Sequence, residues 1–147
     1  NKKYKKLDSI QKLFSTTDRS HLLSLGYTNI YDADILEYLK TVPVEKYDLI
    51  VALDVIEHLM RGDAFSVIDY SLYLCDHLML VWPSKNMQFA SLMFDVHKTS
   101  FELRHLADYF DVVYYSHAMD VDHHPDSKYH IAVIRGHQNS KNRPTLV

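Results

Sequence analysis

Two acids and a histidine follow an apolar stretch of this chain within five positions. Asp54, Glu57 and His58 come directly after residues 48–53, which are mostly aliphatic and β-branched. A continuous apolar run of this kind predicts a strand buried on both faces of a parallel sheet. Ligands of open α/β sheets bind beyond the carboxyl ends of the strands, where carboxylates and an imidazole can exchange protons. In the alternative interpretation, Asp54 caps a helix and the other two side chains are solvated in its first turn.

The rest of the chain alternates between strand-like and helix-like patterns, which predicts an α/β fold with a mostly parallel sheet. The last two strands have no helix between them, so we expect an antiparallel hairpin there. We expect strands over 6–10, 27–31, 48–53, 78–82, 112–115 and 129–135, helices over 18–25, 35–40, 64–75 and 100–110, and a loop through 61–63. Residues 1–136 then form one domain, and residues 137–147 form a polar tail.

Composition limits the class of protein. The chain has 147 residues, is 47% apolar and carries a net charge of -3. That charge argues against binding to nucleic-acid phosphates. The single Cys75 cannot form an internal disulfide, so we expect a reducing, cytoplasmic location and an inert thiol in the core. No apolar run is long enough for a membrane span. Because the chain begins with Asn, we expect its start to be processed, tag-derived or cut from a longer reading frame.

The segment YDLIVALDVIEHL, residues 47–59, resembles the fourth strand of class I S-adenosylmethionine-dependent methyltransferases, in which a (Y/F)DLI strand precedes D-V-(I/L)-E-H-(L/V). Further segments resemble other elements of that fold. YTNIYDADILEYL resembles the third strand, and DHLMLVWPS resembles the fifth strand. SFELRHLADYFDVV resembles the last helix and the sixth strand, and KYHIAVIRG resembles the seventh strand. The resemblance spans residues 5–136. It implies a Rossmann-like methyltransferase sandwich with S-adenosylmethionine as the cofactor.

The glycine-rich D-x-G-x-G loop of that family has no counterpart here, because the only early glycine, Gly26, has the position of a helix stop. Either residues 7–11 are a degenerate first strand and loop, or the chain starts at the second strand. Gln11 lies 23 positions before Asp34, about the family's distance between the acids of the second and third strands, which favours the second explanation. A sheet without its central first strand would expose an unpaired edge. We therefore expect a fragment, a rearranged sheet, a homo-oligomer or a partner chain.

The resemblance also implies roles for individual residues in cofactor binding. Asp34 would accept a hydrogen bond from the adenine amino group, and Ile35 would pack on the adenine ring. A helix-cap role for Asp34 remains open. Gln11 stands where the family has an acid for the ribose hydroxyls, and Leu53 and Asp54 would line the methionine end.

Three residues are catalytic candidates: His58, His97 and Glu57. The ordinary pKa of an imidazole suits a general base near neutrality, and His58 is the first choice for that role. His97 resembles the histidine that precedes the last helix in several methyltransferases. Together with Asp54, the three candidates also resemble the set that binds a divalent metal in small-RNA 2′-O-methyltransferases. Two carboxylates and two imidazoles are a suitable metal shell.

Several functions remain open. The first is a methyltransferase, or its C-terminal part, that acts on a hydroxyl or carboxylate of a small molecule or glycan. The second is a non-catalytic methyltransferase-like module that stabilises a partner. A metal-assisted RNA 2′-O-methyltransferase is a further alternative. The Asp- and His-rich segment 120–126 could also bind a divalent cation for phosphoester hydrolysis, although a solvated hairpin loop explains it better.

Overall fold

The computed structural model describes residues 8–10, 19–31, 33–41, 47–83, 98–119 and 128–137. These residues fall into two compact units, residues 1–42 and 43–147, and each unit is described by itself. Gln11, His97 and the segment 120–126, which carry sequence predictions, lie outside the described residues. None of the described helices is both long and apolar enough to cross a membrane.

The first unit contains a parallel pair of short strands. Strand β1 (Asp8–Ile10) pairs with β2 (Asn29–Tyr31), and Asp8 lies opposite Asn29. Between them lies helix α1 (Arg19–Ser24), and helix α2 (Ile35–Thr41) follows β2. The predicted helix stop at Gly26 is confirmed, because Gly26 has a φ of +94° and its N–H donates to the carbonyl oxygen of Leu23. Glycine adopts this left-handed conformation without steric cost.

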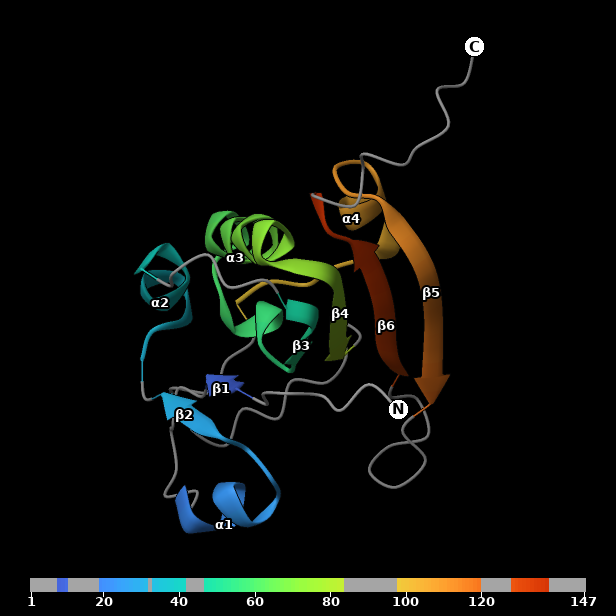
Figure 1. Cartoon of the computed structure of the whole chain (residues 1–147). Helices are drawn as coiled ribbons and strands as arrows, with labels where there is room; N and C mark the ends of the chain where they lie inside the picture. The colour runs from blue at the N-terminus through green and yellow to red at the C-terminus, as the bar shows by residue number, and fades with distance from the viewer. Residues whose placement is uncertain are drawn as a thin grey trace. The chain divides into compact units, whose positions relative to one another are not determined.

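The second unit is built on a four-stranded sheet with the order β3-β4-β6-β5 (Figure 1). Its strands are β3 (Tyr47–Leu53), β4 (Cys75–Pro83), β5 (Val112–Met119) and β6 (Lys128–Arg135). Strands β3 and β4 are parallel, whereas β6 is antiparallel to both β4 and β5. The predicted α/β class and the antiparallel C-terminal hairpin are therefore confirmed. The described residues of this unit also form three helical segments, namely the 3₁₀ turn η1 (Ile56–His58), α3 (Arg61–Leu74) and α4 (Leu103–Ala107).

Several helix boundaries differ from the sequence predictions: α4 covers only Leu103–Ala107 of the helix expected over 100–110, and both ends of α3 are shifted. The loop predicted over 61–63 is the first turn of α3, and the Ala64 N–H donates to the carbonyl oxygen of Met60 at 2.9 Å. Gly62 suggested a loop, but a helix tolerates one glycine in its first turn at a small cost. At the other end, Cys75 is not helical but begins β4, so α3 passes directly into a strand.

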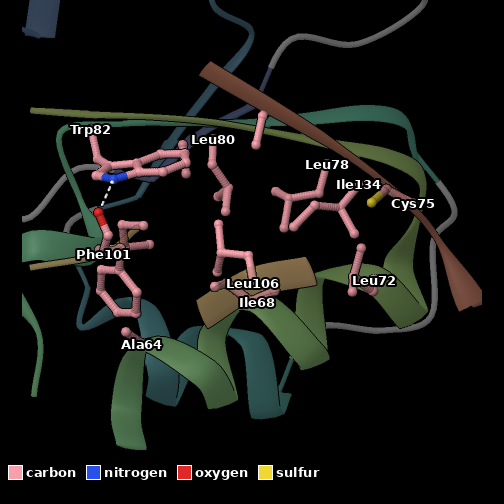
Figure 2. Close-up of a cluster of buried hydrophobic side chains, with 13 residues drawn as sticks. Ala64, Ile68, Leu72, Cys75, Leu78, Leu80, Trp82, Phe101, Leu106 and Ile134 are labelled. Atoms are coloured by element: carbon pink, nitrogen blue, oxygen red, sulfur yellow. Dashed lines mark hydrogen bonds between the residues drawn. The ribbon is translucent and has the colours of Figure 1, made fainter. Parts of the chain in front are cut away.

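The core lies between α3 and one face of the sheet. Figure 2 shows Leu78, Leu80 and Trp82 of β4 above side chains of α3, with side chains from the segment around α4 beside them. The α3 residues are Ala64, Ile68 and Leu72, and the others are Phe101 and Leu106. The Trp82 indole N–H donates to the Phe101 carbonyl oxygen at 3.1 Å, so this buried donor is satisfied.

Strand β3 does not have the environment that its sequence predicts. Only Ala52 is buried, whereas Leu49, Val51 and Leu53 are 48%, 43% and 56% exposed. Alternate side chains of a strand point to opposite faces, so these three share the face opposite the core. The expectation of burial on both faces is therefore wrong. The physical reason is that β3 is the outer strand, and no described strand pairs with its second edge.

Candidate functional site

The chain turns sharply where β3 ends. Asp54 has a φ of +51°, a left-handed conformation that few residues other than glycine adopt, although Asp tolerates it. Its N–H donates to the Val81 carbonyl oxygen at 3.0 Å, which continues the pairing of β3 with β4 by one residue. Asp54 is exposed at the carboxyl end of the two parallel strands. Backbone conformations of this kind concentrate at functional sites.

Glu57 of η1 is a buried acid. Its side chain is only 2% exposed, and neither carboxyl oxygen has a hydrogen-bond partner among the described residues. Burial raises the pKa of this carboxyl to about 8, and the nearby Asp54 carboxylate adds to the rise. Glu57 therefore keeps its proton at neutral pH. The interpretation of Glu57 as a solvated first-turn residue is wrong.

The backbone of Glu57 bonds to residues far along the chain. The N–H groups of Lys98 and Thr99 both donate to the Glu57 carbonyl oxygen, at 2.8 and 3.1 Å. The Thr99 hydroxyl donates to the carbonyl oxygen of Leu59 at 2.8 Å. The segment that leads into Phe101 and α4 is thus fastened to η1.

His58 lies beside this acid but does not bond to it closely. Its Nε2 atom is 3.8 Å from Oε1 of Glu57, and its side chain is 32% exposed. The residue before η1 is Val55, and no side chain caps the turn, so Asp54 is not the helix cap of the alternative interpretation. Asp54, Glu57 and His58 are therefore neighbours at the end of β3. No three acidic, histidine or cysteine side chains converge as metal ligands within the described ranges.

In the first unit, Asp34 is the cap of α2. Its Oδ1 atom accepts hydrogen bonds from the N–H groups of Leu36 and Glu37, at 3.0 and 3.3 Å. Asp34 is exposed and Ile35 is half-buried. The capping role is therefore observed, whereas the predicted contacts of Asp34 and Ile35 with adenine stay predictions.

Sequence reasoning missed one polar pair in the second unit. The Tyr115 hydroxyl and Nδ1 of His130 are 2.7 Å apart, and the His130 ring stacks on Trp82. His130 lies directly opposite Trp82 near the carboxyl end of β4. The signal in the sequence was the alternation of KYHIAVIR, which puts His130 on the same face as the buried Ala132 and Ile134. The sequence did not reveal the strand register that brings His130 to Tyr115.

Several solved structures share this arrangement of strands and helices. The N-methyltransferase NodS from Bradyrhizobium japonicum WM9, in complex with S-adenosylhomocysteine, is 18% identical with a TM-score of 0.63, over 90% of this chain and 67% of NodS. The methyltransferase domain of bacterial CtHen1 is 13% identical with a TM-score of 0.57, over 88% of this chain and 77% of that one. The chain has the fold of class I S-adenosylmethionine-dependent methyltransferases.

A third structure supports the methyltransferase fold. Magnesium protoporphyrin IX methyltransferase ChlM from Synechocystis PCC 6803, with bound S-adenosylhomocysteine, is 18% identical with a TM-score of 0.52, over 79% of this chain and 55% of ChlM. Neither a protein-family model nor a curated protein sequence matches the chain. The resemblance found in the sequence is thus confirmed at the level of the fold, and Asp54 and Glu57 lie at the carboxyl edge of its sheet.

Proposed function

We propose that the chain is an S-adenosylmethionine-dependent methyltransferase, or the C-terminal part of one, that acts on a small molecule or a glycan. The observation that supports this most is the end of β3, where the exposed, left-handed Asp54 precedes the buried acid Glu57. These residues occupy the edge at which open α/β sheets bind ligands. NodS and ChlM, which have similar folds, were both crystallised with S-adenosylhomocysteine.

The residues at this edge suit such a cofactor. The exposed Leu53 offers apolar surface and Asp54 offers a carboxylate, which complements a cationic sulfonium and an α-ammonium group. In this proposal Asp34 and Ile35 bind adenine, and Gln11 binds the ribose. When bound, S-adenosylmethionine supplies a methyl group on a positively charged sulfur.

On the acceptor side, His58, Glu57 and His97 remain the proposed catalytic residues. His58, which the sequence suggests as the general base, is half-buried beside Glu57. A neutral Glu57 carries a proton that it can donate in a hydrogen bond, which an ionised carboxylate cannot do. We assign no step to a metal ion, because the described residues bring no set of ligands together.

Titration calorimetry of the full chain with S-adenosylhomocysteine tests cofactor binding. We expect binding in the micromolar range. Asp34→Ser keeps a good helix cap but removes the carboxylate, so it should weaken binding by roughly tenfold or more if Asp34 contacts the adenine amino group. The matched control is Asp63→Asn, which removes an exposed acid from α3 and should leave the affinity unchanged. If the folded chain gives no heat of binding, the proposal is wrong for this chain.

The exposed face of β3 favours a second element of the proposal, that the chain functions as a homo-oligomer or with a partner chain. Leu49, Val51 and Leu53 form an apolar row on an outer strand, and such strands pair readily with other chains. Light scattering after size exclusion should show an assembly, and Val51→Lys should dissociate it. A wild-type chain that stays monomeric at high concentration, with or without a candidate partner, would exclude this element of the proposal.

A further inference from the structure

A row of three ring side chains crosses the sheet near the carboxyl end of β4. The register places Trp82 of β4 directly opposite His130 of β6, and His130 directly opposite His117 of β5. Directly opposite residues on neighbouring strands lie on the same face and interact. Tyr115, two positions before His117, lies on this face as well. The row therefore lies near the same edge as Asp54, whose N–H pairs with Val81, the residue before Trp82.

Three contacts within the described part of the chain hold the ring of His130. The Tyr115 hydroxyl lies 2.7 Å from Nδ1 of His130. The His130 and Trp82 rings are stacked, with centroids 5.2 Å apart and planes 20° apart. The Tyr115 and His130 rings are also nearly parallel, at 24°. Trp82 is fully buried and fastened to the Phe101 carbonyl oxygen, so the ring beneath His130 is itself held in place.

This arrangement suits the transfer and storage of a proton. A tyrosine hydroxyl that donates to Nδ1 still has lone pairs on Oη and can accept a hydrogen bond from a second hydroxyl. An imidazolium that forms above an indole face is stabilised by the cation–π interaction, for which tryptophan is the best ring. Tyr115 and His130 are both half-buried, so both are partly shielded from water. The hydroxyl of Tyr115 can therefore relay a proton to a site prepared for positive charge.

We propose that Tyr115 and His130, in place of His58, remove the proton of the methyl acceptor, an inference that rests on the proposed function. The lone pair of the acceptor's hydroxyl oxygen forms the new bond to the methyl carbon, and the carbon–sulfur bonding pair stays with sulfur. The acceptor's proton passes to Oη of Tyr115 while the tyrosine's own proton passes to Nδ1 of His130. The positive charge lost from sulfur thus reappears on His130, and Tyr115 stays neutral throughout.

The hydrogen bond predicts the resting tautomer of His130. If Tyr115 donates to Nδ1, the neutral ring carries its proton on Nε2. Nitrogen-15 NMR of the full chain should show this tautomer in the wild type and in Tyr114→Phe, which changes an exposed tyrosine on the other face. In Tyr115→Phe, the His130 ring should no longer favour the tautomer with its proton on Nε2. A wild-type ring protonated on Nδ1 would overturn the proposed relay.

A second NMR measurement separates a role in the reaction from a purely structural one. S-adenosylmethionine and S-adenosylhomocysteine differ by one methyl group and one positive charge, so only a histidine near the reacting sulfur should distinguish them. We expect His130 to titrate at lower pH in the S-adenosylmethionine complex than in the S-adenosylhomocysteine complex. His137, which follows β6 at the opposite edge and bonds to Asp69, serves as the internal control and should titrate identically in both.

The possible outcomes distinguish the two proposals. If calorimetry shows that both ligands bind but His130 titrates identically in the two complexes, the proton-transfer role is wrong while the proposed function stands. If neither ligand binds, the proposed function fails and the role of Tyr115 and His130 fails with it.

Discussion

Lys98 donates its backbone N–H to the carbonyl oxygen of Glu57 at 2.8 Å, and this bond joins the turn after β3 to the segment before α4. The bond satisfies the backbone of Glu57 while its side chain stays buried without a described partner. A buried polar group that lacks a partner destabilises a fold, and a protein retains one most readily where a site needs it. The fastening of Lys98 to η1 therefore explains how a costly acid is held in place.

Stability should depend on pH through Glu57. Its native pKa of about 8 lies above the ordinary 4.5, so between these values the folded chain holds a proton that the unfolded chain releases. The contribution of this proton to the free energy of unfolding is thus fully present below pH 4.5 and is lost as the pH rises through 8. Denaturant unfolding should show that the wild type loses about 3 kcal/mol more than Glu57→Gln between pH 5 and pH 8.

The control for this prediction is Asp63→Asn, since Asp63 is an exposed acid of α3. The free energy of unfolding of Asp63→Asn should change with pH as that of the wild type does. Parallel pH profiles for the wild type and Glu57→Gln would show that Glu57 does not keep its proton in the folded chain.

Gly136 and Gly62 should respond oppositely to alanine. A β-carbon at position 136 would overlap the carbonyl oxygen of Cys75, and the Gly136 N–H donates to the Asp76 carbonyl oxygen at 2.8 Å, so this backbone cannot withdraw easily. At position 62, in the first turn of α3, a β-carbon would meet nothing within 4 Å. We expect Gly136→Ala to cost several kcal/mol and Gly62→Ala to add about 0.5–1 kcal/mol. Thermal unfolding measures both, and equal effects would contradict the close approach at Gly136.

Two leucines on neighbouring strands should differ in their importance for stability. Leu80 of β4 is 1% exposed, whereas Leu49 of β3 is 48% exposed. Leu80→Ala should cost about 2–5 kcal/mol, because it leaves a cavity against α3. Leu49→Ala should cost less than about 1 kcal/mol. If denaturant melts showed a large loss for Leu49→Ala, the outer face of β3 would be covered rather than exposed.

The cap of α2 gives a local prediction. Asp34→Ala should destabilise the helix by about 1 kcal/mol, because the N–H groups of Leu36 and Glu37 lose their acceptor. Asp34→Ser should retain most of the stability. Hydrogen exchange at these two amides measures the effect, and unchanged protection in Asp34→Ala would rule out the cap.

The local sequence was sufficient to predict the elements that recur through short-range patterns. The apolar run before Asp54 is a strand, residues at helical spacing such as Ile68 and Leu72 form the buried side of α3, and the last two strands form a hairpin. The proximity of Asp54, Glu57 and His58 was also predictable, because the three residues lie within one turn of the chain.

Features that depend on distant residues could not be predicted. The backbone bonds of Glu57 join it to Lys98 and Thr99, and the contact of Tyr115 with His130 requires a particular register of β5 and β6. The exposure of β3 depends on how many strands the sheet has, which composition does not reveal. Gln11 and His97 stay predictions, as do the adenine contacts of Asp34.

The passage of α3 into β4 without an intervening loop makes Cys75 a reporter of how the core opens. Its thiol is fully buried at the junction, and its carbonyl oxygen lies against Gly136, the residue after β6. A thiol reagent can reach it only when α3 and β4 separate, and no other cysteine in the chain competes for the reagent. The rate of labelling therefore counts openings of the native core, and a ligand that binds at the carboxyl edge of the sheet should slow it.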